Sequence, residues 1–428
     1  MAGATLAEEA TRRPPILDDP FLWLEEVEGK RALEWVKQRN GETLAELQAD
    51  KRYEPFLAQA EALLNATDRI PYGSIRGRHI YNFWRDAEHI RGILRRTTLE
   101  SYRTAEPEWE TVLDVDALAR AEDENWVYKS IAWLAPGYER CLVKLSRGGT
   151  DASVHREFDA LAKRFVEGGF VLPEAKSGVA WLDRDTLLVG TNWGEGSLTK
   201  SGYPRIAKRW KRGTPLAKAV TVFEGRQEDI GIWPRVMDSG EATLPMVDQS
   251  LTFYTGAYHL IGGGGKLRRL PLPESVDLAG FYAGRILFTL RDAWEVAGRT
   301  FPEGALLAID AAAFRESGEL PSIETVYTPD DRTSIEGVTV SRSGLYVSLL
   351  QNVKGRILRF GVDAKSGKWN AEPLPLPDNG TVSLSAANPH SETVLVNYED
   401  HITPDQLSEY DAGANALTLL KSLPPRFR

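Results

Sequence analysis

The sequence of 428 residues is long enough for one large domain or two to three ordinary ones, and its 42% hydrophobic and 26% charged residues are typical of a globular protein with a sizeable core. Its 52 Lys and Arg against 61 Asp and Glu give a net charge of −9, which argues against a dedicated nucleic-acid binder or a binder of anionic membranes. The single cysteine, Cys141, excludes an internal disulfide and favours a reducing compartment. Residues 1–18 predict a flexible leader without an apolar run of signal-peptide length, and no stretch approaches the roughly 18 apolar residues of a membrane span. These features predict a cytoplasmic protein that contacts neither nucleic acid nor membrane.

Residues 19–70 predict a helical segment of two or three helices. Asp19, followed by proline, is typical of a helix start. From Ala32 to Leu47 the apolar positions recur every three or four residues, as one face of a helix requires. After Ile70 the pattern changes to short alternating runs punctuated by Gly, Pro, Asn and Asp, so a domain boundary is expected near residue 70.

Residues 71–428 contain seven similar runs of aliphatic and aromatic residues that each end in a polar turn. The runs are IYNFWRD (80–86), CLVKLSR (141–147), TLLVGTN (186–192), LTFYTGA (251–257), ILFTLRD (286–292), LYVSLLQ (345–351) and VLVNYED (394–400). Their mean spacing of about 52 residues lies in the range of propeller blades and similar arrays. Further strand-like segments follow most runs, for example RGILRRTTL (91–99) and TVLDVDAL (111–118). Three or four strands in each of seven units predict a mainly β fold, a seven-bladed β-propeller with an N-terminal helical extension; an unrelated sandwich pair or β-helix is the alternative.

The segment from Asp19 to Thr43 resembles the N-terminal helical region of the prolyl oligopeptidase family of serine peptidases. The matching residues are Asp19-Pro20-Phe21, Trp23-Leu24-Glu25-Glu26, Trp35-Val36, Gln38, Asn40 and Thr43. Four later segments look like propeller segments of bacterial members: 90–103, 109–118, 146–159 and 201–216. The resemblance covers the chain from about residue 19 to 428. It implies a seven-bladed propeller inserted between this helical segment and an α/β-hydrolase catalytic domain, which is the implied partner.

The catalytic serine of that family requires a sharp strand-to-helix turn flanked by glycines, and the sequence contains no G-x-S-x-G. The nearest candidates, Gly73 to Gly77 and Gly194 to Ser197, lack the spacing. In the family, the nucleophile, aspartate and histidine all follow the propeller, whereas this chain stops at Arg428. No catalytic residue is therefore assigned to any position, and the chain alone is expected to be inactive toward peptides.

Other candidate sites are also better explained without a ligand, so no cofactor or metal is predicted. The six histidines (79, 89, 155, 259, 390, 401) form no zinc-binding pattern, and Gly262 to Gly265 lacks the Lys-Ser/Thr of a phosphate loop. Asp114 and Asp116 do not fit a calcium loop and are expected to be turn or surface carboxylates. The basic run at Arg205, Lys208, Arg209, Lys211 and Arg212 is interpreted as a blade edge or a domain-facing surface, and Cys141 as a buried, inert thiol.

The leading hypothesis is the propeller of a prolyl oligopeptidase-like peptidase. The resemblance implies that such a propeller limits the active site to short peptides, usually cleaved after proline. The alternative is a stand-alone propeller that serves as a binding scaffold, and a third hypothesis is a propeller glycosidase or lactonase with carboxylates in its central channel. Because the helical segment would pack on a hydrolase domain, Trp23 and Trp35 are expected to be unusually exposed, disordered or covered by a second copy of the chain.

Overall fold

The structure is a computed structural model that describes residues 19–26 and 28–425, so the predicted leader at 1–18 lies outside the described residues. The chain divides into two compact units, Met1–Ala66 and Thr67–Arg428. Each is described separately below. Among the described helices, none is both long and apolar enough to cross a membrane.

The described part of the first unit contains a 3-10 turn, η2 (Leu22–Glu25), and two helices, α1 (Lys30–Ala49) and α2 (Tyr53–Leu64). Asp19 lies in the turn before η2 rather than at the start of a long helix, and its Oδ1 accepts a hydrogen bond from Phe21 N at 2.8 Å. The long helix begins eleven positions later, at Lys30, directly after Gly29. The helix start predicted at Asp19 is therefore a turn, and the long helix starts at Lys30.

The tryptophans of this unit contact each other through their rings. The Trp23 and Trp35 ring centroids lie 6.3 Å apart in an edge-to-face arrangement, and the Arg31 guanidinium lies 3.9 Å from the Trp23 ring centroid. Trp35 is 40% exposed, which agrees with the expectation, whereas Trp23 is only partly exposed. Further apolar side chains of α1 and α2 are also exposed: Leu33, Val36, Leu44, Leu47, Phe56, Leu57, Leu63 and Leu64.

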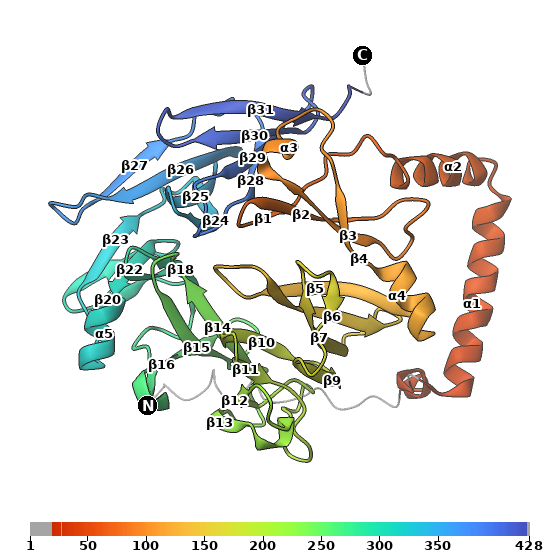
Figure 1. Ribbon diagram of the computed structural model, residues 1–428, viewed down its shortest axis with the longest axis horizontal. Coiled ribbons are helices and arrows are strands. Elements are labelled where there is room, and N and C mark those ends of the chain that lie inside the picture. The colour runs from red at the N-terminus through yellow and green to blue at the C-terminus, as the bar shows by residue number, and fades with distance from the viewer. Residues whose placement is uncertain (1–18, 27, 426–428) are drawn as a thin grey trace, which may run out of the picture. The chain divides into compact units, whose positions relative to one another are not determined.

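The second unit is a seven-bladed β-propeller in which each blade is one antiparallel sheet, as the sequence predicts (Figure 1). Blades 1 to 4 follow the chain order. Their strands are β1 (Ser74–Arg76), β2 (His79–Trp84), β3 (Ile93–Thr98), β4 (Glu110–Asp114); β5 (Trp126–Trp133), β6 (Arg140–Arg147), β7 (Ser153–Asp159), β8 (Arg164–Phe165), β9 (Val171–Ala175); β10 (Gly178–Asp183), β11 (Thr186–Gly190), β12 (Ile206–Lys211), β13 (Val220–Glu224); and β14 (Gly231–Asp238), β15 (Thr243–Ser250), β16 (Gly256–Ile261), β17 (Leu267–Arg269).

Blades 5 to 7 complete the ring, and blade 5 carries an inserted hairpin of β20 and β21. Their strands are β18 (Val276–Tyr282), β19 (Arg285–Leu290), β20 (Trp294–Val296), β21 (Arg299–Phe301), β22 (Leu306–Asp310), β23 (Ile323–Tyr327); β24 (Thr333–Ser341), β25 (Gly344–Gln351), β26 (Lys354–Val362), β27 (Trp369–Pro373); and β28 (Thr381–Ala386), β29 (Val394–Glu399), β30 (Gln406–Asp411), β31 (Ala416–Ser422). Short helices α3 (Leu99–Tyr102), α4 (Val115–Glu122) and α5 (Ala311–Ser317) decorate blades 1 and 5.

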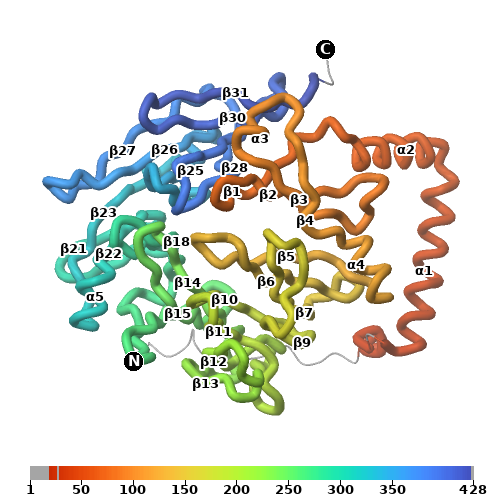
Figure 2. Tube along the Cα trace, in the orientation of Figure 1, coloured from red at the N-terminus to blue at the C-terminus, as the bar shows by residue number. Residues whose placement is uncertain are grey.

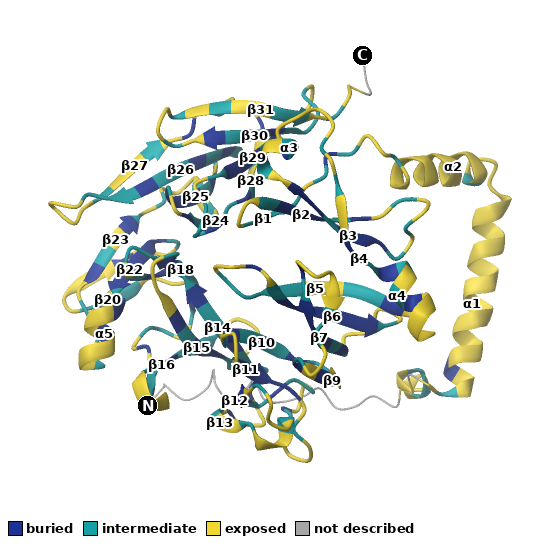
Figure 3. Cartoon of the chain, viewed as in Figure 1, coloured by how far each residue is buried: buried dark blue, intermediate teal, exposed yellow. Residues whose placement is uncertain are grey.

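Six of the seven predicted runs coincide with the second strand of a blade: β2, β6, β11, β19, β25 and β29. Second strands are covered on both faces by neighbouring blades, so they appear as continuous apolar runs, and Figure 3 shows them largely buried. The fourth prediction is wrong: residues 251–255 form the turn between β15 and β16, where Phe253 is 83% exposed, and only Gly256 and Ala257 of that run lie in a strand, the third of the blade. The predicted strand at 111–118 is also too long, because Asp114 ends β4 and caps α4 by accepting a hydrogen bond from Ala117 N.

Because the strands of each blade alternate in direction, the first strand of every blade begins at the same end of the ring. The hairpins between second and third strands lie at this end, and the propeller segment of the chain begins and ends there. We call it the terminal face. The hairpins between first and second strands lie at the opposite end, which we call the far face.

Among the described residues, blades 1 and 7 share no strand: blade 1 is built from residues 74–114 and blade 7 from residues 381–422. Side chains hold the seam instead. Apolar residues of both blades form one buried cluster that includes Ile75, Ile80, Leu395 and Leu407. At its edge, Arg103 donates two hydrogen bonds of 2.7 Å to the Glu409 carboxylate.

Candidate functional site

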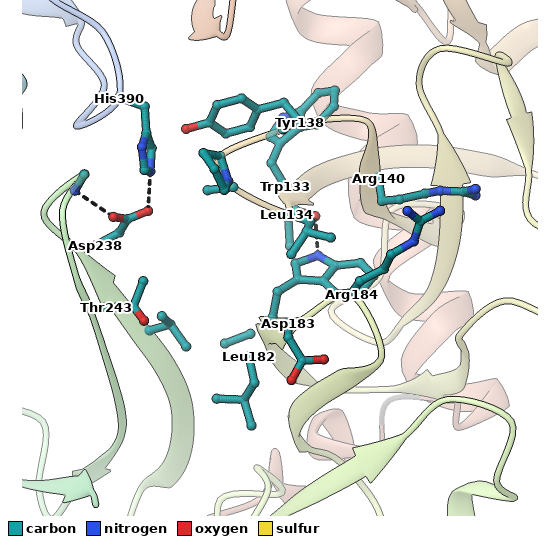
Figure 4. A pocket seen from close by; sticks show the side chains of 18 of the residues that line it. Trp133, Leu134, Tyr138, Arg140, Leu182, Asp183, Arg184, Asp238, Thr243 and His390 are labelled. Carbon is teal, nitrogen blue, oxygen red and sulfur yellow. Dashed lines mark hydrogen bonds and ion pairs between the residues drawn. The ribbon is translucent and has the colours of Figure 1, made fainter.

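A cavity of about 840 Å³ opens at the far face among the first-to-second-strand hairpins of blades 2, 3 and 4, with a residue of blade 7 at its edge (Figure 4). Its walls are mostly apolar and aromatic, and charged side chains stand around them. The apolar side chains include Trp133, Leu134, Pro136, Trp181 and Leu182, and the charged ones include Glu139, Arg140, Asp183, Arg184 and Asp238.

His390, of the β28–β29 loop, and Asp238, at the end of β14, form a polar pair at the edge of this cavity. His390 Nε2 lies 2.7 Å from Asp238 Oδ2, and Asp238 Oδ1 accepts a hydrogen bond from Gly240 N at 2.7 Å. A His–Asp pair needs a neighbouring hydroxyl or thiol to act in nucleophilic catalysis. Within the described residues, no Ser, Thr or Cys side chain hydrogen-bonds to the His390 ring, so this pair gives no support for a nucleophile here.

The remaining histidines lie apart from one another in the propeller. His155 is buried on β7, and burial lowers its pKa to about 4; burial also lowers the pKa of His259 to about 4. In the described part of the chain, no group of three or more His, Cys, Asp or Glu side chains is arranged to hold a metal ion.

Ion pairs and burial account for the basic run and for Cys141. Arg205 and Arg212 flank β12 and are ion-paired with carboxylates, and Trp210 between them is buried. Cys141 on β6 is fully buried, its Sγ lies 3.6 Å from the Phe158 carbonyl oxygen, and burial raises the pKa of its thiol. A thiol in these surroundings is protonated and shielded from reagents.

Gly262 to Gly265 form the turn of the β16–β17 hairpin. Asp116 accepts hydrogen bonds from the backbone N–H groups of Arg91 and Gly92. The glycine run and the Asp116 carboxylate therefore each form part of a turn.

The terminal face differs from the far face in the side chains that its hairpins expose. Four of the seven second-to-third-strand connections carry a strongly exposed apolar or aromatic residue. These residues are Ile90 (76% exposed), Phe253 (83%) with Tyr254 (68%), Val353 (88%) and Ile402 (93%), in blades 1, 4, 6 and 7. Large apolar groups exposed on one face are typical of a surface that another protein or domain covers.

Asp248, on β15 at this face, is a buried carboxylate with one oxygen that is unpaired in the described structure. Its Oδ2 lies 2.9 Å from Arg235 Nε, whereas its Oδ1 is buried and has no hydrogen-bond partner among the described residues. Burial raises the pKa of Asp248 to about 6, and the nearby Arg235 charge counteracts this only in part. Asp248 was not among the predicted site residues, because the predicted strand at 251–257 falls on the turn that follows β15.

Asp248→Asn should change how stability depends on pH. Because the pKa of Asp248 is higher in the folded chain than in the unfolded chain, its protonated side chain adds to the free energy of unfolding. This stabilisation is fully present below pH ~4 and is lost as the pH rises through about 6. We therefore expect wild type to lose ~2–3 kcal/mol relative to the variant between pH 4.5 and pH 7.5, measured by urea unfolding. The exposed Asp277→Asn serves as the control, and equal pH dependence of wild type and Asp248→Asn would contradict the prediction.

Comparison with known proteins agrees with this architecture. The profile of the prolyl oligopeptidase N-terminal beta-propeller domain matches residues 8–241 and 293–423. The chain is 37% identical over 423 residues to an uncharacterized peptidase of Sinorhizobium fredii, covering 96% of this chain and 57% of that protein. It is 25% identical over 397 residues to an uncharacterized peptidase of Rickettsia prowazekii, covering 89% of this chain and 55% of that protein.

Solved structures give the same result. A post-proline cleaving enzyme from Rickettsia typhi superposes with a TM-score of 0.88 at 25% identity, covering 95% of this chain and 60% of that one. Oligopeptidase B from Leishmania major has the same fold, with a TM-score of 0.68 at 13% identity, over 95% of this chain and 56% of that one. The chain thus spans somewhat more than half the length of the relatives that it matches. With this coverage and the seven-bladed ring, the chain belongs to the prolyl oligopeptidase family and comprises that family's N-terminal β-propeller domain.

Proposed function

We propose that this chain is the substrate-restricting part of a serine peptidase that cleaves short peptides after proline. The observation that carries the proposal is the match over 95% of the chain to a post-proline cleaving enzyme, of which the chain spans 60%. In this proposal the remaining part of the protein supplies the nucleophile, aspartate and histidine, and the propeller limits which peptides reach them. Restricting access in this way excludes folded proteins from the reaction and keeps the reacting groups out of bulk water.

The terminal face is the surface that fits the α/β-hydrolase domain. The propeller segment begins and ends at this face, so a domain joined at either end lies next to it. The exposed Phe253, Tyr254, Val353 and Ile402 provide the apolar area that such a domain would bury, at ~25 cal/mol per Å². Exposed apolar side chains of α1 and α2, such as Leu44 and Leu47, provide a second surface for the same partner.

The test compares the 428-residue chain with a chain extended by its downstream coding sequence, or by the corresponding segment of the Sinorhizobium relative. We expect no hydrolysis of a short fluorogenic Pro-containing peptide by the 428-residue chain. The extended chain should cleave after proline and react with a fluorophosphonate, which labels active serines. A folded extended chain that neither reacts nor cleaves would overturn the proposal and favour a binding scaffold.

Phe253→Ser/Tyr254→Ser tests the docking surface in the same assay. Because both side chains are exposed, we expect the stability of the 428-residue chain to change by no more than ~0.5 kcal/mol. In the extended chain the activity should fall. Leu161→Ser is the matched control, because Leu161 is 54% exposed but lies in the third-to-fourth-strand connection at the far face. An equal loss of activity in the control would contradict the assignment of the docking face.

A further inference from the structure

The loop between β28 and β29, residues 387–393, contacts four blades other than its own. We call it the axial loop. Its partners are the first-to-second-strand segments of blades 1, 2, 4 and 6, of which only blades 1 and 6 adjoin blade 7 in the ring. Blades 2 and 4 are not neighbours of blade 7, so their hairpins reach it only by extending toward the middle of the ring. Figure 2 shows the hairpin between β5 and β6 projecting beyond its blade in this direction.

Asn388 joins the axial loop to blades 1 and 2. The Tyr138 hydroxyl, from the β5–β6 hairpin, donates to Asn388 Oδ1 at 3.0 Å, and Asn388 Nδ2 donates to the Ile75 carbonyl oxygen at 2.8 Å. The same Oδ1 accepts a hydrogen bond from His390 N at 2.8 Å. Tyr138 is 7% and Asn388 3% exposed, so these bonds lie away from water, and removing one partner leaves buried polar groups unpaired.

His390 joins the axial loop to blade 4. Besides the 2.7 Å contact between its Nε2 and Asp238 Oδ2, the backbones of the two hairpins touch. Gly240 has φ +84°, and a Cβ added there would lie 2.3 Å from the Pro389 carbonyl oxygen. Only glycine fits this approach. The ring of His390 also packs edge-on against Tyr138, with centroids 6.2 Å apart, so the blade 2 and blade 4 contacts share one side chain.

Blade 6 adds a third set of contacts to the axial loop. Arg342, in the β24–β25 turn, donates its backbone N–H to the Ser391 carbonyl oxygen at 3.0 Å. Its guanidinium donates to the His390 carbonyl oxygen at 2.6 Å. The axial loop is thus hydrogen-bonded to blades 1, 2, 4 and 6.

We propose that the axial loop is an internal lock that holds the propeller ring closed. Since no strand is shared between blades 1 and 7 in the described part of the chain, separation of these blades is resisted by the seam cluster at the blade interface and by the axial loop at the far face. Because the loop joins blade 7 to blades 2 and 4 across the ring, blade 7 cannot swing outward without breaking bonds to non-neighbouring blades. The lock is distinct from the proposed docking surface, which lies at the opposite end.

Hydrogen–deuterium exchange of the 428-residue chain tests the lock. Asn388→Ala removes the bonds to blades 1 and 2, and His390→Ala removes the bond to blade 4. If the contacts act as one lock, each variant should speed exchange about tenfold in all three segments at residues 74–79, 134–139 and 238–243. His401 is an exposed histidine of the same blade at the terminal face, and His401→Ala should leave exchange in these three segments unchanged.

Faster exchange only in the blade whose own bond was removed, or no change in any of the three segments, would overturn the proposal. If an alanine variant fails to fold, His390→Gln and Asp238→Asn provide milder changes to the same contact. The four substitutions at Asn388, His390 and Asp238 all lie away from the terminal face, so loss of the lock and failure of the proposed peptidase function remain distinguishable.

Discussion

Replacing Arg212 by Met is expected to destabilise the propeller by about 3–5 kcal/mol, because it leaves a buried carboxylate without its countercharge. Glu157 on β7 is 2% exposed. Its carboxylate accepts hydrogen bonds from Arg212 Nη1 at 2.8 Å, Arg212 Nη2 at 3.0 Å and Phe170 N at 2.8 Å. The bidentate pair joins blade 3 to blade 2, and the guanidinium also lies 4.5 Å from the Phe170 ring centroid. Urea unfolding at pH 7.5 measures the loss.

Two further variants separate this pair from an ordinary surface ion pair. Arg269 and Glu274 are both about half exposed, so Arg269→Met should cost no more than ~1 kcal/mol. In a Glu157→Gln background, Arg212→Met should cost much less than it does in wild type, because no buried charge is left behind. A loss on Arg212→Met as small as that on Arg269→Met would contradict the prediction.

The fold was predictable from sequence mainly because of the second strands. Runs such as CLVKLSR contain fully buried Leu142, Val143 and Leu145, which contact the blades on both sides. Blade 4 departs from this pattern: its second strand, TLPMVDQS, carries Pro245, Asp248 and Gln249. The adjacent turn, by contrast, contains Phe253 and Tyr254, which resemble a strand in composition but are exposed. Apolar composition alone does not distinguish a buried strand from a turn on a docking surface.

The sites were less predictable, because the residues that meet at the far face are distant in the sequence. Tyr138 and Asn388 are 250 positions apart, and Asp238 and His390 are 152 apart. In the sequence each is a single polar or aromatic residue near a turn, and His390 was one of six scattered histidines. These residues come together only when the blades close into a ring. Predicting their contacts would require the register of every strand, which the sequence does not provide. The pair of buried Glu157 and half-buried Arg212 was hidden for the same reason, although Arg212 was noted as part of a basic run at a blade edge.

Leu395→Ala is expected to destabilise the chain by about 3–5 kcal/mol, because Leu395 fills the seam cluster between blades 7 and 1. It is 1% exposed on β29 and lies in one cluster with Ile75, Ile80 and Leu407. Truncation removes apolar contact area and leaves a cavity in an interface where the described residues show no shared strand. Urea unfolding measures the total loss, and hydrogen–deuterium exchange shows where the structure loosens.

Leu187→Ala provides the matched comparison at an ordinary blade interface. Leu187 occupies the second position of β11, as Leu395 does in β29, and it is fully buried between blades 2 and 3. The two variants should lose similar stability, since the same side chain is truncated in a similar core. Their exchange patterns should differ: Leu395→Ala should loosen β1 and β2 together with blade 7, because side-chain contacts and the axial loop join blades 1 and 7 in the described structure. Leu187→Ala should loosen blades 2 and 3, whose connecting chain limits their separation. If Leu395→Ala left β1 and β2 fully protected, the seam cluster would not be what joins the first blade to the last.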